Sequence, residues 1–349
     1  MKIAIIGDTH FGVKSDSPNF HALYESFYKS FINYLIVNDI KQVIQLGDLF
    51  DKRRNICFNT LSECKRYFFR PLEEAGITLH TLIGNHDIYF RQSLSVNSSG
   101  LVLGEFKNIY VYDKPTQITF KDTTVDIIPW ICEENKEEVM TFISNSKSDL
   151  CCGHFEIENF SMNKGAESIG GLSKDIFKRY EGVYSGHYHT RSDKDNIHYV
   201  GTPYELTWAD YNDPKGFAEF DIETRQYKFI ESPFTMFYRH EYDDTKTNYA
   251  TMDFTPFKQK YIKIVVANKT DFYQFDVFIK KLYALDTYEI KILEDLSDFS
   301  NGEVDKEIDL ENTIDILESY IDSVADESNK DSIKIFLKTI YLEALETTK

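Results

Sequence analysis

Five short motifs that combine glycine with carboxylate, amide or imidazole side chains each follow an apolar segment of this 349-residue chain. They are Gly7-Asp8-Thr9-His10, Gly47-Asp48, Gly84-Asn85-His86-Asp87, Gly153-His154 and Gly186-His187-Tyr188-His189, and they contain five of the nine histidines. Functional sites of α/β proteins are built from loops at the carboxyl ends of strands, and glycine lets such a loop turn sharply and approach an ion closely. The pattern therefore predicts one site assembled from several strand ends.

The donor atoms in these motifs suit a pair of divalent metal ions. Oxygen donors and imidazole nitrogens come from Asp8, Asp48, Asn85, His10, His154, His187 and His189. A carboxylate such as that of Asp48 can bridge two ions about 3.5–4 Å apart, as in two-metal hydrolases. Such ions lower the pKa of a water, so that hydroxide can attack a phosphoryl group in line. We therefore expect a two-metal phosphodiesterase.

Each motif taken alone has a simpler explanation. A single Asp-x-His after a strand is often a turn or a hydrogen-bonded pair, because short motifs match by chance. Asp87 could orient His86 or cap the following segment. Cys151 and Cys152 are better explained as small strand residues than as zinc ligands. Chance does not explain five such motifs in one order, so we retain the metal-site interpretation.

The elements that must position these residues are short apolar strands that alternate with longer amphipathic segments. In the first 155 residues, strand candidates lie at 2–7, 42–47, 77–83, 124–129 and 149–154. Helical patterns lie between them at 18–38 and 59–74. After Ser185 the strands become shorter (197–200, 217–222 and 226–231), which is closer to an antiparallel sheet. The sum predicts an α/β fold with a core of two sheets flanked by helices.

The pattern breaks near residues 232–256 and continues in smaller units. A strand over 261–267, a helix over 272–285 and a strand over 287–293 predict a small β-α-β unit. After an acidic linker, two amphipathic helices follow, the first with a heptad-like stripe of apolar residues. We therefore divide the chain into residues 1–240, 257–295, 296–308 and 309–349. The terminal helices could dock a partner or pack on their own domain.

The order of the motifs resembles that of the calcineurin-like metallophosphoesterases, whose pattern is D-x-H, G-D, G-N-H-D, H and G-H-x-H. The segments Asp48-Leu49-Phe50-Asp51, Ile128-Pro129-Trp130 and Gly201-Thr202-Pro203 narrow the resemblance to SbcD-type DNA repair nucleases, and within these to the recombination endonuclease subunits of T-even-type phages. The resemblance covers nearly the whole chain. It implies a two-sheet metallophosphoesterase sandwich, a small α+β capping domain at 257–295 that restricts access to DNA, and C-terminal helices that dock on an SMC-like coiled-coil ATPase.

The resemblance also implies a role for each site residue. Asp8, His10, Asp48 and His189 would hold one metal ion, and Asp48, Asn85, His154 and His187 would hold the other. Family members favour manganese, with magnesium as the alternative. His86 is similar to the catalytic histidine of the family, which stabilises or protonates the leaving oxygen, and we group Asp87 with it as catalytic.

One position departs from the family pattern. Asp51 stands where many cellular members carry a histidine that handles the substrate strand, which leaves the balance of exonuclease and endonuclease action open. Lys52, Arg53 and Arg54 follow, and they are either DNA phosphate contacts or a solvated charged turn. The helices at 18–38 and 59–74 would build a homodimer within a heterotetramer, as in the family.

Charge and composition define the setting in which we expect the chain to act. The net charge is −18, yet residues 294–331 hold 14 acidic residues against two lysines, so most of the acidity lies in one C-terminal stretch. A partner is therefore expected to supply much of the positive surface that DNA requires. The five cysteines lack C-x-x-C spacing, which is typical of reduced thiols in the cytosol, and no segment approaches the ~18 apolar residues of a membrane span.

The sequence thus predicts a cytoplasmic, metal-dependent DNA nuclease subunit of a recombination or repair complex with an SMC-like ATPase (in the host cytoplasm if it is phage-encoded). A phosphatase or cyclic-nucleotide phosphodiesterase that uses the same metals is the alternative enzyme. The alternative without catalysis is a scaffold with structural metals. The non-ligand histidine His86 argues against the scaffold, because catalysis needs such a residue and structure does not.

Overall fold

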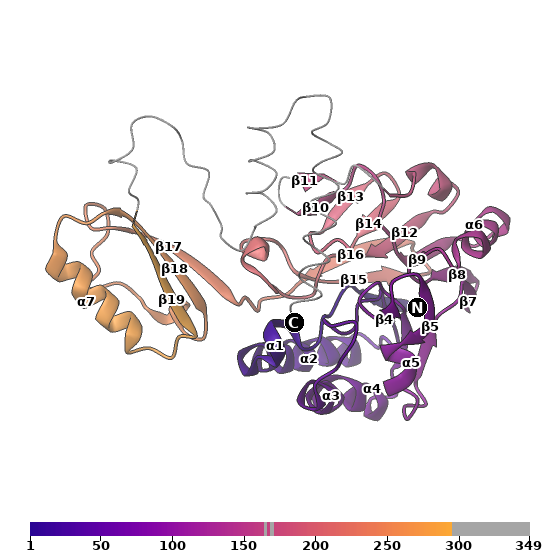
Figure 1. Ribbon diagram of the computed structural model, residues 1–349, viewed down its shortest axis with the longest axis horizontal. Coiled ribbons are helices and arrows are strands. Elements are labelled where there is room, and N and C mark those ends of the chain that lie inside the picture. The colour runs from indigo at the N-terminus through magenta and orange to yellow at the C-terminus, as the bar shows by residue number, and fades with distance from the viewer. Residues whose placement is uncertain (164–165, 168–170, 295–349) are drawn as a thin grey trace. The chain divides into compact units, whose positions relative to one another are not determined.

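The computed structural model describes residues 1–163, 166–167 and 171–294 (Figure 1). The acidic linker expected at 296–308 and the helices expected at 309–349 lie outside these residues. The α-helices within them are α1 (Val13–Asp16), α2 (Pro18–Val37), α3 (Phe58–Cys64), α4 (Arg70–Glu74), α5 (Ser98–Val102), α6 (Lys136–Asn145) and α7 (Phe272–Tyr283). In this part of the chain, no helix combines the length and the apolarity that crossing a membrane requires.

The first central sheet has the strand order β16-β15-β1-β2-β3-β6. Its strands are β1 (Lys2–Ile6), β2 (Gln42–Gln45), β3 (Thr78–Leu82), β6 (Ile109–Tyr112), β15 (Gly216–Asp221) and β16 (Gln226–Glu231). The pairs β1–β2, β2–β3 and β3–β6 are parallel, whereas β15 runs antiparallel to β1 and to β16. The strands β1, β2 and β3 therefore end at the same edge of the sheet.

The second central sheet has the order β13-β14-β12-β9-β8-β7. Its strands are β7 (Thr116–Phe120), β8 (Thr123–Ile128), β9 (Leu150–His154), β12 (Gly182–Gly186), β13 (Ser192–Lys194) and β14 (Ile197–Tyr199). Its four inner strands are parallel, and β7 and β13 are antiparallel edges. The short strands after Ser185 do not share one antiparallel sheet: β14 is parallel to β12, and β15 and β16 complete the first sheet. Sequence alternation shows which residues are buried, but not which sheet edge a strand joins.

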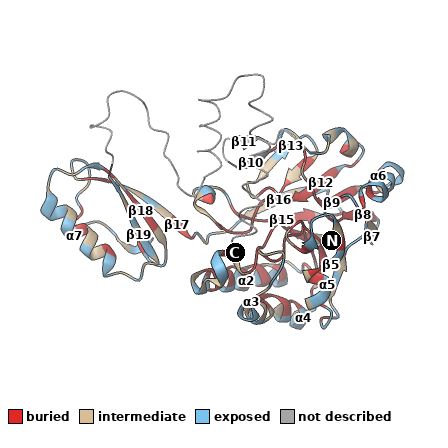
Figure 2. Cartoon of the chain, viewed as in Figure 1, coloured by how far each residue is buried: buried red, intermediate tan, exposed pale blue. Residues whose placement is uncertain are grey.

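The core between the sheets follows from the alternation of apolar side chains along each strand. Ile3 and Ile5 of β1 pack in one cluster with Val125 and Cys152 of the second sheet, while Ala4 and Ile6 belong to the cluster that contains α2. Cys151 points into a third cluster, beneath α6. Both cysteines are buried strand residues, as expected, and all five cysteines are free thiols. Figure 2 shows how completely the central strands are buried.

Helices α1 to α4 lie together beside the first sheet in Figure 1. Pro18 is the first residue of α2, where its missing N–H costs nothing because that group would have no partner within the helix. One face of the helix buries Phe20, Tyr24, Phe27 and Phe31. The helix expected at 59–74 is α3, a π-helical turn (Lys65–Phe69) and α4. Pro71 has no N–H to donate to the carbonyl four residues earlier, which explains the wider turn before it.

A third sheet has the order β17-β18-β19 and packs with α7 around its own apolar cluster. The strands β18 (Tyr261–Asn268) and β19 (Glu289–Glu294) occur where the small unit was expected. The strand β17 (Phe237–Asp243) was not predicted, and it pairs in parallel with β18. The boundary that we placed after residue 240 therefore cuts a strand of the small unit. The sequence Phe-Tyr-Arg-His-Glu-Tyr mixes apolar and charged residues, because this strand is covered on one side only. Such a mixture does not show the pattern by which a strand is predicted.

Two hairpins complete the described elements. The strands β4 (Ile88–Phe90) and β5 (Ser93–Asn97) form one hairpin directly after the Gly84 motif, and β10 (Ser161–Asn163) and β11 (Ala166–Glu167) form the other. Short 3₁₀ turns lie at Lys174–Phe177, Trp208–Asp210 and Thr255–Phe257.

Candidate metal centre

The motif residues meet at one edge of the two central sheets. In the first sheet, the loops after β1, β2 and β3 carry Asp8, Asp48 and Asn85. In the second sheet, β9 ends on His154 and β12 ends on the glycine before His187. Parallel strands deliver their carboxyl ends to the same edge, so side chains far apart in the sequence come together there.

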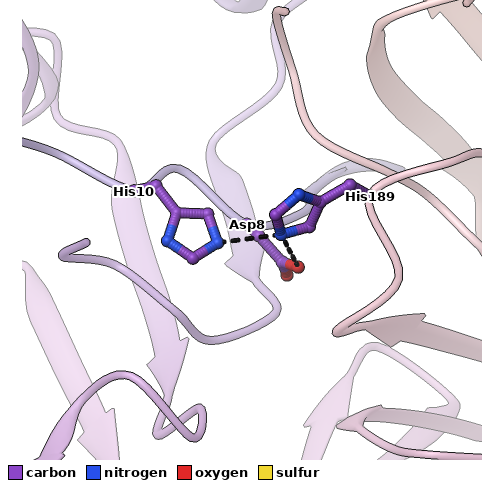
Figure 3. A group of neighbouring side chains, drawn as sticks. All are labelled: Asp8, His10 and His189. Atoms are coloured by element: carbon purple, nitrogen blue, oxygen red, sulfur yellow. Dashed lines mark hydrogen bonds and ion pairs between the residues drawn. The ribbon is translucent and has the colours of Figure 1, made fainter. Parts of the chain in front are cut away.

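Asp8, His10 and His189 form what we call the first half-site (Figure 3). One ligand-type atom from each lies within 4.8 Å of the others. Nε2 of His10 faces Nε2 of His189 at 3.0 Å, and the latter lies 3.9 Å from Asp8 Oδ2. Two nitrogens held ~2.1 Å from one ion at a right angle would be about 3.0 Å apart, so this spacing fits a shared metal.

Asn85, His154 and His187 form the second half-site. Oδ1 of Asn85 lies 2.8 Å from His154 Nε2 and 3.0 Å from His187 Nδ1. The backbone carbonyl of Leu46 accepts a hydrogen bond from His154 Nδ1 at 2.7 Å, which directs Nε2 towards Asn85. An imidazole nitrogen facing an amide oxygen needs a proton or a cation between them, and the second half-site therefore also fits a metal ion.

Asp48 lies between the two half-sites. Its Oδ2 is 3.8 Å from His10 Nε2 in the first half-site and 3.4 Å from His154 Nε2 in the second. Its Oδ1 accepts a hydrogen bond from the backbone amide of His86 at 2.7 Å. One carboxylate oxygen thus reaches both half-sites, while the other fixes the next loop.

Close backbone approach makes two of the glycines necessary. A Cβ at Gly186 would lie 2.4 Å from Asp8 Oδ1, and a Cβ at Gly47, where φ is +89°, would lie 2.7 Å from His154 Nδ1. Asp48 and His187 themselves adopt positive φ of 51° and 88°. Non-glycine residues in this region each cost about 1–3 kcal/mol, and such strain is concentrated at functional sites.

Burial determines the charge state of the ligand-type residues. It lowers the pKa of His10 well below its usual range, that of His187 to about 3 and that of His189 to about 4, so these imidazoles are neutral, as metal ligands must be. Burial would also lower the pKa of His154, but Asp48 outweighs it and raises that pKa to about 9. Burial raises the pKa of Asp8 to about 8. A divalent cation would favour the ionised form of this buried carboxylate.

His86 lies beside the first half-site without belonging to it. Its ring centre is 5.0 Å from that of His10, and its Nδ1 donates a hydrogen bond to the backbone carbonyl of Asp51 at 2.6 Å. Because a carbonyl can only accept, Nδ1 carries a proton and Nε2 is the atom that can exchange one with a ligand. The main chain of Asp51 orients His86, whichever side chain that position carries.

Asp87 lies between the loop that carries Asp48 and the loop that carries Asn85. It is fully buried; Oδ1 accepts from the Leu49 amide at 3.0 Å and Oδ2 from the Gly84 amide at 2.9 Å, and the Ser98 hydroxyl donates to Oδ1. These bonds join the loop after β2 to the loop after β3. Because both of its oxygens are engaged, Asp87 positions the loops of Asp48 and Asn85, and its grouping with His86 as catalytic stays a prediction.

The basic triplet lies in the loop that follows Asp51. Lys52 and Arg53 are half-buried, and Arg54 is exposed with its guanidinium 5.9 Å from the centre of the Tyr89 ring. The triplet adjoins the metal centre through Asp51, whose Oδ1 is 3.9 Å from His10 Nδ1.

Three supporting residues were missed by sequence reasoning. Lys215 is buried, and its Nζ donates to the His189 backbone carbonyl at 2.8 Å and pairs with Asp210 and Asp213 at 2.7 and 2.9 Å. Tyr204 donates to the Thr9 carbonyl at 2.6 Å and Tyr24 to the His10 carbonyl at 3.2 Å. Lys215 follows an Asn-Asp-Pro turn, which in sequence is typical of a solvated loop, so no local signal reveals it.

Comparisons with known proteins place this site in a family. Residues 1–215 match the family model of the calcineurin-like phosphoesterases. The chain is 33% identical over 349 residues to exonuclease subunit 1 of Enterobacteria phage T4, an alignment that covers 99% of this chain and 100% of the relative.

Two solved structures align more weakly. One is a novel archaeal phosphodiesterase (14% identity, 66% of this chain and 100% of that chain, TM-score 0.35). The other is GAP50, the anchor in the inner membrane complex of Plasmodium (13% identity, 63% of this chain and 80% of that chain, TM-score 0.39). Structural likeness at these TM-scores is too weak to support a conclusion about this chain.

The matched residues include both half-sites, Asp48, His86 and Lys215, and they make up more than half of the chain. Members of the matched family are metal-dependent phosphoesterases, which agrees with the donor set gathered at this edge of the sheets. The chain belongs to the calcineurin-like phosphoesterase family.

Proposed function

We propose that the chain is a DNA nuclease subunit that hydrolyses phosphodiester bonds with two divalent ions, manganese or magnesium. The observation that carries the proposal is the position of Asp48, whose Oδ2 lies within 4 Å of an imidazole nitrogen in each half-site. The first half-site would hold one ion, the second half-site the other, and Asp48 would contact both. When bound, such a pair supplies Lewis acidity towards phosphoryl oxygens and a water of lowered pKa.

The side chains of the chain would divide the remaining work. Neutral His10, His187 and His189 each keep one ring nitrogen with a lone pair, as a metal ligand requires. Protonated His86 would donate from Nε2 to the leaving oxygen, since its Nδ1 is committed to the Asp51 carbonyl. Asp87 would keep the loops of Asp48 and Asn85 at a fixed separation.

The likeness to exonuclease subunit 1 of phage T4 supports a nuclease rather than a phosphatase, because it extends over 99% of the chain. A small-substrate phosphatase needs neither the third sheet with α7 nor the acidic C-terminal stretch. DNA as the nucleic acid rests on the motif resemblance to SbcD-type nucleases. Lys52, Arg53 and Arg54 would contact the DNA backbone beside the metal centre.

The relative is named a subunit, which supports a partner for this chain as well. The partner that we propose is an SMC-like coiled-coil ATPase, docked on the helices expected at 309–349, with two copies of the chain in a heterotetramer. The chain is acidic, and most of its negative charge lies in the stretch at 294–331 rather than in the metallophosphoesterase part. Because an acidic chain offers little positive surface to DNA, the ATPase would contribute to DNA binding in the host cytoplasm.

The proposal is tested by comparing two substrates with the purified chain in manganese, with and without EDTA. We expect linear DNA to be cut, EDTA to stop the reaction and added manganese to restore it. Hydrolysis of p-nitrophenyl phosphate without any cleavage of DNA would show a phosphatase instead.

A binding experiment tests the partner separately. In the full chain, Leu317→Asp with Ile321→Asp should abolish co-purification with the ATPase and leave manganese-dependent cleavage intact. The surface changes Glu318→Ala and Asp322→Ala, next to those positions in the heptad, provide the control. Unchanged ATPase binding in the apolar-to-Asp variant would remove the helices as the docking segment.

A further inference from the structure

A cavity of about 320 Å³ has a residue of the second half-site in its wall. Its lining includes His154, Trp130, Phe155, Leu172, Gln92 and Glu156. None of the functions assigned above uses this cavity. Because His154 belongs both to the cavity wall and to the second half-site, the cavity lies next to the metal centre.

The inner wall of the cavity is aromatic. The ring centre of Trp130 lies 5.1 Å from that of His187 and 5.8 Å from that of His154. Its backbone is fixed from both sides, since its amide donates to the Ile83 carbonyl at 2.7 Å and its carbonyl accepts from Asn135 Nδ2 at 2.9 Å. Buried Phe155 adds a second apolar surface. A flat aromatic wall held this firmly suits a planar ligand.

The rim of the cavity carries mixed donors and acceptors. Gln92, at the tip of the β4–β5 hairpin, accepts a hydrogen bond from the Glu133 amide through Oε1 at 3.2 Å, which leaves its NH₂ group to meet a ligand. Glu156 and Glu133 offer acceptors, and Lys136 offers a donor. Two carboxylates beside one ammonium disfavour a phosphate in the cavity, whereas amide and carboxylate groups pair well with the edges of bases.

We infer that this cavity receives one unpaired nucleobase of the strand that is being cut, with the adjoining phosphate at the metal centre. The inference rests on the proposed nuclease function and adds a requirement to it. The volume of this cavity is near the lower end of the range for small-molecule sites, so it accommodates one base but not a base pair. The nucleotide next to the cut must therefore leave its stack, as bases do in enzymes that act on flipped nucleotides. Single strands and frayed ends are the substrates that meet this requirement at the lowest cost.

The inference is tested with single-stranded oligonucleotides that carry an abasic nucleotide on one side or the other of the cleaved bond. With the unmodified chain and manganese, we expect one of the two abasic substrates to be cut about tenfold more slowly than the intact strand, the size of effect that base–aromatic stacking gives. In Trp130→Leu, this difference between intact and abasic strands should fall below about twofold. The matched control is Tyr110→Leu, an exposed aromatic on the edge strand β6, which should keep the tenfold difference.

The readout is a ratio between two DNA substrates, so a general loss of activity does not imitate it. Manganese content is measured in the same samples. If Trp130→Leu has lost metal or fold, the second variant Gln92→Ala, on the exposed hairpin tip, tests the base site instead. We expect it to change the preference among the four bases by at least threefold. Equal cutting of intact and abasic strands by the unmodified chain would overturn the base site alone. Hydrolysis of bis(4-nitrophenyl) phosphate without cutting of any DNA would overturn the nuclease function instead.

Discussion

The first and second half-sites differ in what holds their side chains in place. In the second, Asn85 joins His154 and His187 through one oxygen, the Leu46 carbonyl orients His154, and Trp130 packs against both rings. In the first, two imidazole nitrogens face each other at 3.0 Å, and Nδ1 of His10 is buried without a hydrogen-bond partner among the described residues.

The difference suggests that the two half-sites depend on metal to different degrees. Hydrogen bonds and ring packing pre-organise the second half-site, so its geometry should persist without an ion. The first half-site brings together groups that attract one another weakly until a cation sits between them. Its support comes from the backbone instead, through Lys215 at the His189 carbonyl and Tyr24 at the His10 carbonyl.

The largest effect should come from removing what the two half-sites share. Asp48→Asn keeps the shape of the side chain but removes the negative charge that both imidazole groups face. We expect the rate of DNA cleavage to fall by more than about 10³-fold, because both ions lose a ligand. This loss is larger than the one expected from removing a single electrostatic contact. Manganese content, measured by elemental analysis, should drop for both half-sites. Retention of two ions per chain would contradict a shared ligand.

The next effect should leave both half-sites filled. His86→Ala removes the proton donor at Nε2, and we expect cleavage to slow by roughly 10²–10³-fold. The bound manganese should stay at the unmodified level, since neither half-site contains His86. His86→Gln, which keeps a hydrogen-bonding group but cannot donate an acidic proton, should be equally slow. Full activity in either variant would rule His86 out as the acid.

A matched pair of alanine variants compares the half-sites directly. His189→Ala should weaken manganese binding by more than about 100-fold, because His10 then has no facing nitrogen. His187→Ala should weaken it by only about tenfold, because Asn85 and His154 keep their mutual contact. Calorimetric titration with manganese measures both. Equal losses would show that pre-organisation does not distinguish the two half-sites.

The smallest effect concerns the backbone support of the first half-site. Lys215→Met should lower manganese affinity by roughly tenfold, the lower end for partners that orient a ligand, and Lys215→Arg should restore part of it. Lys260→Met is the control, since Lys260 is a half-buried lysine that is hydrogen-bonded to Thr235 and not to a half-site residue. A drop in melting temperature with unchanged manganese affinity would make Lys215 a purely structural residue.

Much of this arrangement was predictable from the sequence, because it depends on local patterns. Apolar runs predicted the strands β1, β2, β3, β8 and β9 of the two-sheet core, and the glycine after β1, β2 and β3 and near the end of β9 marked where the chain turns into the site. The types of donor in those loops predicted a metal-dependent phosphoesterase, and the family match agrees. The strand β17 was missed, since its mixed pattern depends on what covers the segment rather than on its own periodicity. The π-turn was missed although its cause, Pro71, stands in the sequence.

The sequence by itself therefore determined which side chains could bind metal and the class of fold that would gather them. Only the tertiary structure decided how they are used, because the decisive contacts join residues far apart in the chain. His10 and His189 meet across 179 positions, and Oδ1 of Asp87 accepts from the amide of Leu49, 38 positions earlier. The burial of Lys215 and the cavity beside Trp130 likewise exist only once both sheets have packed. Local patterns carry no record of such contacts, since any of these residues could equally have faced solvent.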